Sequence, residues 1–256
     1  MVPKKTLKLI KSLQLKKYRY QEKLFLVEGA KSIVELLDSS LRVRTLISTS
    51  VFINQHISFI QRYSPELEIY QAEESAISSI SSFKNNNAGI AVVEMPALQV
   101  PSALVGYALV LDNIRDPGNL GTIIRIADWY GISTIICSPE TTDEFHPKVI
   151  SASMGSFLRV VIYRTELTSY LQKAKLPIYG TLVNQGTSVH DLDFAPQGLI
   201  LLGNESEGIS ELVKGYITNA VCIPQFGNAE SLNVSIAAAV ICDNMKRNAT
   251  HRRVAS

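Results

Sequence analysis

Apolar residues in the first hundred positions follow two alternating spacings. In some stretches they recur every third or fourth position, and in others they form short runs bounded by polar residues. The first spacing is that of an amphipathic helix, and the second is that of a strand. The pattern predicts helices at Lys4–Leu13, Lys31–Leu37, Phe52–Tyr63 and Glu73–Ile80, and strands at Leu24–Glu28, Arg42–Ser48, Leu67–Tyr70 and Gly89–Glu94. Strands that alternate with helices indicate a small α/β domain.

The alternation resumes after residue 105 with more uniformly apolar strands. Tyr107–Leu111 and Leu199–Leu202 are apolar throughout, as strands buried on both faces of a parallel sheet are. Further predicted strands are Thr134–Cys137, Leu158–Ile162, Ile178–Thr181 and Ala220–Ile223, and predicted helices are Gly121–Tyr130, Pro147–Ala152, Leu167–Lys173, Ser210–Lys214 and Val234–Lys246. We expect an open, mostly parallel sheet covered by helices. Such sheets bind ligands beyond the carboxyl ends of their strands.

A short segment separates the two patterns. Residues 96–104 contain Pro96 and Pro101 and have no clear periodicity, which is typical of a linker. We therefore predict a small α/β domain at 1–95, a linker at 96–104 and a larger α/β domain at 105–256.

The formal net charge of +2 is unevenly distributed, because both ends of the chain are basic and the stretch between them is acidic. Residues 1–23 carry eight basic residues and one acid, and the tail from Lys246 onward carries four basic residues and no acid. The stretch between them carries 13 basic and 22 acidic residues. Clustered Lys and Arg neutralise phosphates, which favours a nucleic-acid partner; a solvated helix face is the alternative. The N-terminal candidates for RNA binding are Lys4, Lys5, Lys8, Lys11, Lys16, Lys17 and Arg19.

Nothing in the pattern indicates a secreted or membrane protein. The longest apolar runs are far too short to span a bilayer, and no apolar signal-peptide core follows the basic N-terminus. The three cysteines, Cys137, Cys222 and Cys242, have neither CxxC nor metal-ligand spacing. We expect a cytoplasmic protein without a metal site and without a membrane partner.

The most unusual polar segment is Asn113–Arg125, which follows the predicted strand Tyr107–Leu111. An ordinary turn needs a single Gly or Asn, whereas this segment gathers several glycines, amides and charges. Glycine permits close approach of a ligand to the backbone, and the Asn119 amide can both donate and accept hydrogen bonds. The plain alternative is an Asx turn followed by an exposed arginine.

Two more polar segments follow predicted strands. Gly203–Gly208 comes directly after Leu199–Leu202, and Ile223–Ser235 leads into the last predicted helix. Gly203 would let a ligand lie against the backbone, and Glu205 is either a polar contact or a carboxylate at a helix N-terminus. Ser231 or Asn233 could simply cap the closing helix.

Together, the three segments resemble the motifs of a known family. Asn113-x-Arg115-Asp116-Pro117-Gly118-Asn119-x-Gly121-Thr122-x-x-Arg125 resembles motif 1 of the SpoU/TrmH branch of the SPOUT RNA methyltransferases, and the segments at 203–208 and 223–235 resemble its motifs 2 and 3. The resemblance covers about 105–247. The first domain is similar, more weakly, to the substrate-binding domain that often precedes the catalytic one, best at Phe25–Gly29. Ser206 departs from the pattern, since many members have glycine there.

The resemblance implies a fold, a cofactor and a reaction. The catalytic domain would contain a deep C-terminal trefoil knot, which general topology rules disfavour, and would form a homodimer through the knot. It would transfer a methyl group from S-adenosylmethionine to a ribose 2′-hydroxyl of RNA. The implied cofactor-binding positions are Gly203, Ile223, Leu232, Thr181, Leu182 and Ser231.

The implied catalytic positions are Arg125, Asn119, Glu205 and Asn233. Arg125 matches the family arginine that activates the hydroxyl. A free guanidinium is protonated at ordinary pH, so stabilising the developing alkoxide is as physical a role as accepting a proton. The other three would orient Arg125, the ribose and the substrate phosphate, and Arg115 of motif 1 joins the RNA-binding candidates.

Two substrates and one non-enzymatic role stay open. The additional N-terminal domain favours ribosomal RNA, specifically 23S, over transfer RNA, because minimal tRNA-modifying members often lack such a domain. A catalytically silent RNA-binding or ribosome assembly protein is disfavoured by the complete set of four polar residues. A dinucleotide-dependent enzyme would need a GxGxxG fingerprint, which the sequence lacks.

Overall fold

The computed structural model describes residues 2–63, 66–101 and 104–254, with side chains as far as Arg247. The predicted linker at 96–104 and the basic tail, which includes Arg252 and Arg253, lie partly outside these described residues. The chain forms two compact units. One contains the residues up to Ala97 together with Asp143–Leu158, and the other contains Leu98–Thr142 and the residues from Arg159 onward.

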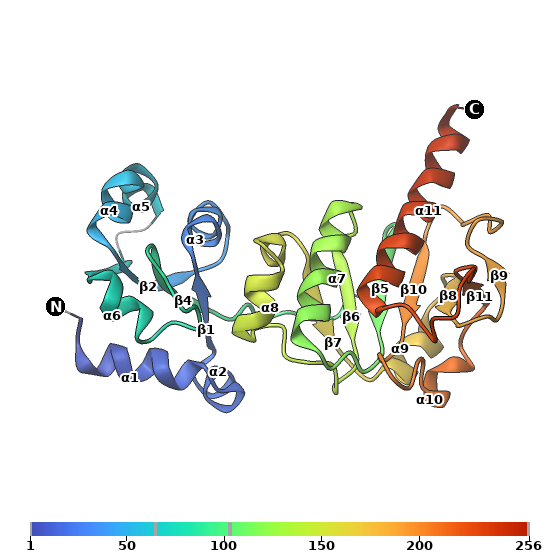
Figure 1. Ribbon diagram of the computed structural model, residues 1–256, viewed down its shortest axis with the longest axis horizontal. Coiled ribbons are helices and arrows are strands. Elements are labelled where there is room, and N and C mark those ends of the chain that lie inside the picture. The colour runs from blue at the N-terminus through green and yellow to red at the C-terminus, as the bar shows by residue number, and fades with distance from the viewer. Residues whose placement is uncertain (1, 64–65, 102–103, 255–256) are drawn as a thin grey trace. The chain divides into compact units, whose positions relative to one another are not determined.

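The first unit is built on a four-stranded sheet with strand order β1-β4-β2-β3 (Figure 1). Its strands are β1 (Leu24–Glu28), β2 (Val43–Ser48), β3 (Glu68–Gln71) and β4 (Gly89–Glu94). β4 runs antiparallel to both of its neighbours, whereas β2 and β3 are parallel. Its helices are α1 (Lys4–Leu13), α2 (Lys16–Glu22), α3 (Ala30–Leu37), α4 (Ser50–Gln55), α5 (Ile57–Tyr63) and α6 (Glu74–Ser78).

Strand β1 shows that both faces of this sheet are covered. All five of its residues are buried. Phe25 and Val27 belong to one apolar cluster, which includes side chains of α3, α4 and α5, whereas Leu24 and Leu26 belong to another, which includes Ile10 of α1. Because successive strand residues point to opposite faces, an uninterrupted apolar run is what a doubly covered strand requires.

Residues 143–158 pack with this unit, although the sequence placed them in the second domain. They form α8 (Pro147–Ala152) and a short 3₁₀ turn at Ser156–Leu158. The physical reason lies in two aromatic side chains. The rings of Phe145 and Phe157 lie 4.7 Å and 6.4 Å from the ring of Phe25, centroid to centroid, and they extend the first unit's core.

The second unit is built on a seven-stranded, entirely parallel sheet with strand order β7-β6-β5-β10-β8-β11-β9 (Figure 1). The strands are β5 (Tyr107–Leu111), β6 (Thr134–Cys137), β7 (Val161–Arg164), β8 (Ile178–Thr181), β9 (Thr187–Ser188), β10 (Gly198–Leu202) and β11 (Asn219–Cys222). The helices are α7 (Pro117–Trp129), α9 (Leu167–Lys173), α10 (Glu211–Lys214) and α11 (Val234–Val254). The predicted α/β class with a mostly parallel sheet is confirmed, and the trefoil knot stays a prediction.

Helices α7 and α11 pack against each other, and each has a side-chain cap at its start. Asp116 accepts a hydrogen bond at Oδ1 from the Asn119 amide at 2.8 Å, and Pro117 occupies the first turn of α7. Asn233 accepts at Oδ1 from the Ser235 amide at 2.9 Å and so caps α11. Among the described residues, no helix is both long enough and apolar enough to cross a membrane.

The elements differ from the predicted ones in a few places. Helix α2 was not predicted, because only one of its seven residues, Arg19, is buried and the segment has no apolar stripe. The predicted helix Phe52–Tyr63 is divided at His56. The strand predicted at Leu158–Ile162 begins at Val161, because Leu158 belongs to the 3₁₀ turn and Arg159 and Val160 form the turn and bend that follow it.

Candidate active site

Three loops meet at the carboxyl edge of the second sheet. Residues 112–116 follow β5, residues 203–208 follow β10, and residues 223–233 follow β11 and lead into α11. Since β5, β10, β8 and β11 are consecutive and parallel, their carboxyl ends share one edge (Figure 1). Ligands of open parallel sheets bind at such an edge.

A hydrogen-bond network joins the three loops. Asn119 donates from Nδ2 to Oε1 of Glu205 at 2.9 Å, and it accepts at Oδ1 from Nδ2 of Asn233, also at 2.9 Å. An ionised carboxylate only accepts hydrogen bonds, so Glu205 fixes the direction in which the Asn119 amide points. The backbone amide of Asp116 also approaches Glu205 Oε1, at 3.4 Å. Three of the four predicted catalytic residues are therefore in direct contact.

Arg125 is the fourth predicted catalytic residue, and the structure does not bring it into this network. It lies six positions after Asn119 on α7, about 9 Å further along the helix axis. Its side chain is exposed, and within the described part of the chain it makes no hydrogen bond or ion pair. The guanidinium is thus available to a ligand.

The loop after β5 is held by residues that the sequence did not single out. Asn113 adopts a left-handed conformation, with φ of 61°. Asn204 Nδ2 donates to its carbonyl oxygen at 2.7 Å, and Ser138 Oγ accepts from its amide at 3.0 Å. Asp112 is buried and accepts from the Ser210 amide at 2.7 Å. Asn204 could have been suspected because it precedes Glu205 in the same motif; nothing in the local sequence marks Ser138.

A cleft of about 790 Å³ opens beside the network. All six residues predicted to bind the cofactor line it: Gly203, Ile223, Leu232, Thr181, Leu182 and Ser231. Glu205 lines it as well, so the cleft and the network share a carboxylate. Its volume lies within the roughly 300–1,000 Å³ of typical small-molecule sites.

The cleft's lining suits S-adenosylmethionine. An adenine ring needs apolar surface, and Leu182, Ile223 and Leu232 supply it together with side chains from α11. The ribose and the charged amino-acid tail need polar partners, and Glu205 and Ser231 offer them. The residues present therefore fit the cofactor that the sequence predicted.

Gly203 has a more local role than predicted. A Cβ atom at this position would lie 2.2 Å from the carbonyl carbon of Gly208 and from the nitrogen of Ile209. Asn204 and Gly208 exchange two backbone hydrogen bonds that close this turn. Glycine is thus required by the close folding of the loop on itself, whatever occupies the cleft.

A side-chain hydrogen bond connects two segments of the cleft lining. Asn184 Nδ2 donates to Oε1 of Gln225 at 3.0 Å, and Gln225 Nε2 donates to the carbonyl oxygens of Gly227 and Ala229 at 2.8 Å. Asn184 has a φ of 53°. Sequence reasoning missed this pair, because Asn184 lies outside the three motif segments and Gln225, although inside the third, had no visible partner in the sequence.

The predicted RNA-binding residues divide into two groups. Arg115 is exposed and donates from Nε to Oδ1 of Asn113 at 3.1 Å, and the six lysines of α1 and α2 are exposed. The prediction for Arg19 is wrong. Its side chain is only 1% exposed, and its guanidinium is bound to Asp143 and to the carbonyl oxygens of Leu13 and Gln14. Because Arg19 is buried and its guanidinium is already bound, it cannot reach a phosphate.

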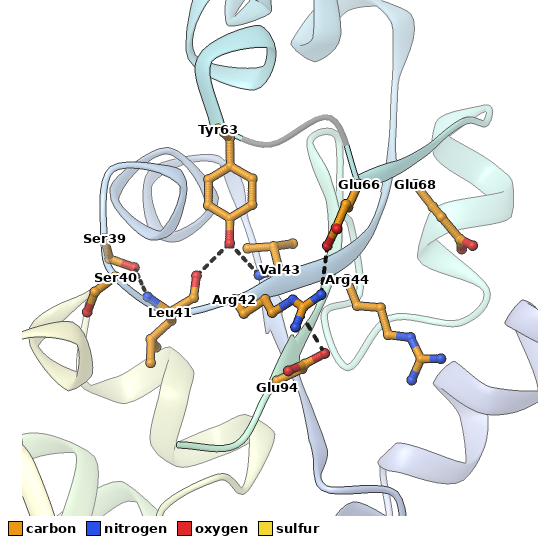
Figure 2. Close-up of a pocket in the computed structure, with 10 residues that line it drawn as sticks. All are labelled: Ser39, Ser40, Leu41, Arg42, Val43, Arg44, Tyr63, Glu66, Glu68 and Glu94. Atoms are coloured by element: carbon orange, nitrogen blue, oxygen red, sulfur yellow. Dashed lines mark hydrogen bonds and ion pairs between the residues drawn. The ribbon is translucent and has the colours of Figure 1, made fainter. Parts of the chain in front are cut away.

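The first unit has a separate cleft of about 600 Å³ at the start of β2. Figure 2 shows the Arg42 guanidinium between Glu66 and Glu94, with nitrogen–oxygen distances of 2.7 Å and 3.8 Å. Tyr63 donates from its hydroxyl to the Leu41 carbonyl at 2.6 Å. The ion pairs are solvent-exposed and contribute little to stability. None of the predicted site residues lines this cleft.

One relative of known sequence matches almost the whole chain. The chain is 28% identical over 239 residues to the 23S rRNA (guanosine(2553)-2′-O)-methyltransferase RlmP of Bacillus subtilis. The match covers 92% of this chain and 94% of the relative.

Solved structures show the same fold. A putative RNA methyltransferase of the TrmH family from Porphyromonas gingivalis matches with a TM-score of 0.85 and 33% identity, covering 96% of this chain and 99% of the other. An AdoMet-bound rRNA methyltransferase from Sinorhizobium meliloti matches with a TM-score of 0.86 and 27% identity, covering 96% of each chain.

Family matches account for both halves of the sequence. Residues 4–91 match the MRM3-like substrate binding domain, and residues 106–243, more than half of the chain, match the SpoU rRNA Methylase family. The predicted family, fold class and enzyme class are thereby confirmed. The chain belongs to the SpoU rRNA methylase family.

Proposed function

We propose that this protein transfers a methyl group from S-adenosylmethionine to the 2′-hydroxyl of a ribose in 23S ribosomal RNA. The observation that carries the proposal is the network of Asn233, Asn119 and Glu205 beside the 790 Å³ cleft. It links all three family motifs in one place, with Glu205 shared between the network and the cleft.

The relatives support the substrate and the cofactor. The Bacillus subtilis relative is named as a 2′-O-methyltransferase of 23S rRNA, and the Sinorhizobium meliloti structure is described as an AdoMet-bound rRNA methyltransferase. Both correspond to nearly the full length of this chain, so the N-terminal unit is part of the comparison.

The chain's own residues would bind the cofactor, orient the ribose and stabilise the charge that develops on its 2′-oxygen. When bound, S-adenosylmethionine supplies an activated methyl group and a neutral thioether leaving group. The lining residues Gly203, Ile223, Leu232, Thr181, Leu182 and Ser231 would hold it. A ribose hydroxyl is a poor nucleophile, so fixing its position against the methyl group contributes much of the rate. Asn119 and Asn233 suit that role, because hydrogen bonds already fix both amides.

Arg125 would supply positive charge. Its exposed guanidinium can bind a phosphate of the RNA through paired N–H donors. The same charge stabilises the alkoxide that develops as the 2′-oxygen loses its proton. A group without an internal ion pair is free to do both.

We propose further that the methylase unit contains the trefoil knot, forms a homodimer and works in the cytoplasm on RNA. Trp129 at the end of α7 is 83% exposed and Ile236 of α11 is 52% exposed, and these two helices pack against each other. Exposed apolar groups that lie on adjoining helices support a dimer interface there. Analytical ultracentrifugation of the wild type and of Trp129→Arg tests this; a monomeric wild type contradicts it.

Mapping of 2′-O-methyl marks in total RNA, with and without the gene for this chain, tests the function. We expect one mark in 23S ribosomal RNA to disappear and to return with the wild-type gene. Loss of a mark only from transfer RNA would overturn the substrate. Loss of no mark, with intact RNA binding, would overturn the reaction and favour a silent RNA-binding protein.

A further inference from the structure

The first two helices, α1 and α2, are in contact and carry an exposed basic surface. Its seven lysines are exposed, and within the described part of the chain none has an ion-pair partner: Lys4, Lys5, Lys8, Lys11, Lys16, Lys17 and Lys23. Lys4, Lys8 and Lys11 are spaced four and three residues apart, which places them on one face of α1. Their positive charge is therefore available to a partner.

Aromatic and apolar groups lie among these lysines. Tyr18 is 36% exposed, and Lys17 Nζ lies 5.9 Å from the centroid of its ring. Leu15, in the turn between the two helices, is 59% exposed. Tyr18 and Leu15 thus add an exposed ring and an exposed apolar side chain to the basic surface.

Arg19 and Asp143 hold the end of α1 against α2. Arg19 donates to the carbonyl oxygens of Leu13 and Gln14 at 2.8 Å and 2.9 Å, where α1 ends and its carbonyls lack helical partners. Asp143 in turn accepts from Arg19 Nε at 2.9 Å and from the Tyr20 hydroxyl at 3.2 Å. The lysines and Tyr18 are thus presented on a fixed support, which lowers the ordering cost of binding.

We propose that the α1–α2 surface binds single-stranded RNA, with Tyr18 stacked on a base and the lysines on phosphates. The proposal rests on the proposed function, since the RNA is the substrate. Base faces are open in single strands and hidden in a duplex, and stacking on aromatic side chains tolerates any base. A lipid surface fits poorly, because the apolar side of α1 is buried in the core through Ile10 and Leu13.

Fluorescence anisotropy of the full-length protein tests the stacking contact. The probes are a labelled 12-nucleotide RNA without secondary structure and a 12-base-pair RNA duplex. We expect Tyr18→Ala to bind the single strand about tenfold more weakly and to bind the duplex with unchanged affinity. Tyr18→Phe, which keeps the ring, should bind as the wild type does. Equal losses on both probes, or no loss on the single strand, would overturn the proposal.

A salt titration tests the phosphate contacts. Replacing Lys8 and Lys11 with alanine should reduce the slope of log K against log salt by about 1.4, at about 0.7 per phosphate on single strands. The matched control replaces Lys173 and Lys175, two exposed lysines at the end of α9 and just beyond it. Equal slopes for the two double variants would overturn the assigned surface.

The binding assays require no methyl transfer, so they fail or succeed independently of the proposed function. If deletion of the gene removes no methyl mark, yet single-strand binding depends on Tyr18, the proposed reaction alone is overturned. A protein that methylates RNA and binds single strands equally well after Tyr18→Ala would overturn this proposal alone. Thermal unfolding of each variant confirms that the fold is intact.

Discussion

Asn233 donates a hydrogen bond from its side-chain amide to Oδ1 of Asn119, although 114 positions separate the two residues in the chain. The bond connects the cap of α11 to the first turn of α7, and Asn119 passes the connection on to Glu205. A group that binds one of these amides would therefore find the others already oriented.

The Asn119–Asn233 pair should act as one unit in catalysis. We expect Asn119→Ala and Asn233→Ser each to lower kcat about a hundredfold, and the double variant to lose little more, because each change breaks the same bond. Serine keeps the cap of α11 while it removes the amide donor. Single-turnover methylation of RNA by the four proteins measures the coupling. Losses that multiply would show that the two amides act independently.

Replacing Arg125 should impair methyl transfer without weakening cofactor binding. Because it lies outside the cleft lining, Arg125→Ala should leave the Kd for S-adenosylmethionine nearly unchanged by calorimetry, while methyl transfer falls by a hundredfold or more. Arg125→Lys keeps the charge without the planar donor fork and should recover part of the rate. Full activity in the alanine variant would contradict the catalytic role assigned to Arg125.

Replacing Gly203 should lower both the thermal stability of the protein and its affinity for the cofactor. Gly203→Ala places a methyl group 2.2 Å from the backbone of Gly208 and Ile209, so the turn must shift. We expect both a lower Tm and weaker binding of S-adenosylmethionine. Gly215→Ala is the matched control, because its added Cβ would meet nothing within 4 Å. Weaker cofactor binding with an unchanged Tm would instead indicate direct blocking of the cleft.

The three polar loops could be predicted because each one directly follows an apolar strand, and parallel strands bring their ends together. The role of Ser138 could not be predicted, since its partner is the Asn113 amide, a backbone group that only the folded loop presents. Arg19 failed for a related reason. It sits among lysines in the sequence, and its counterion Asp143 is 124 positions away. The position of 143–158 was missed because apolar spacing predicts that a side chain packs in a core but not in which core, and Phe145 and Phe157 pack against that of the first unit.

Removing only one partner of the Arg19–Asp143 pair should strongly lower the free energy of unfolding. Both side chains are nearly fully buried, so Asp143→Leu or Arg19→Met should each lower the free energy of unfolding by about 3–5 kcal/mol through the charge left without a partner. The double variant Arg19→Met/Asp143→Leu removes both charges and should lose less than the sum of the single changes. Urea denaturation measures all four proteins, and additive losses would contradict a buried ion pair.

His146 should make stability depend on pH. It caps α8 by accepting at Nδ1 from the Lys148 amide at 3.1 Å, a bond that needs the neutral ring. Burial lowers the pKa of His146, as do the positive charges of Arg19 and Lys148, against an opposing effect of Asp143. Since the unfolded chain then binds the proton more readily, the free energy of unfolding should fall as the pH drops below about 6.5.

His146→Asn isolates this contribution, because asparagine accepts the same capping bond and does not titrate. Chemical denaturation between pH 5 and pH 8, a range chosen around the ordinary histidine pKa of about 6.5, should show a shallower loss of stability for the variant on acidification. The three other histidines are present in both proteins, so they do not enter the comparison. Identical pH profiles would mean that protonation of His146 is not coupled to folding, and that the cap survives on the charged ring.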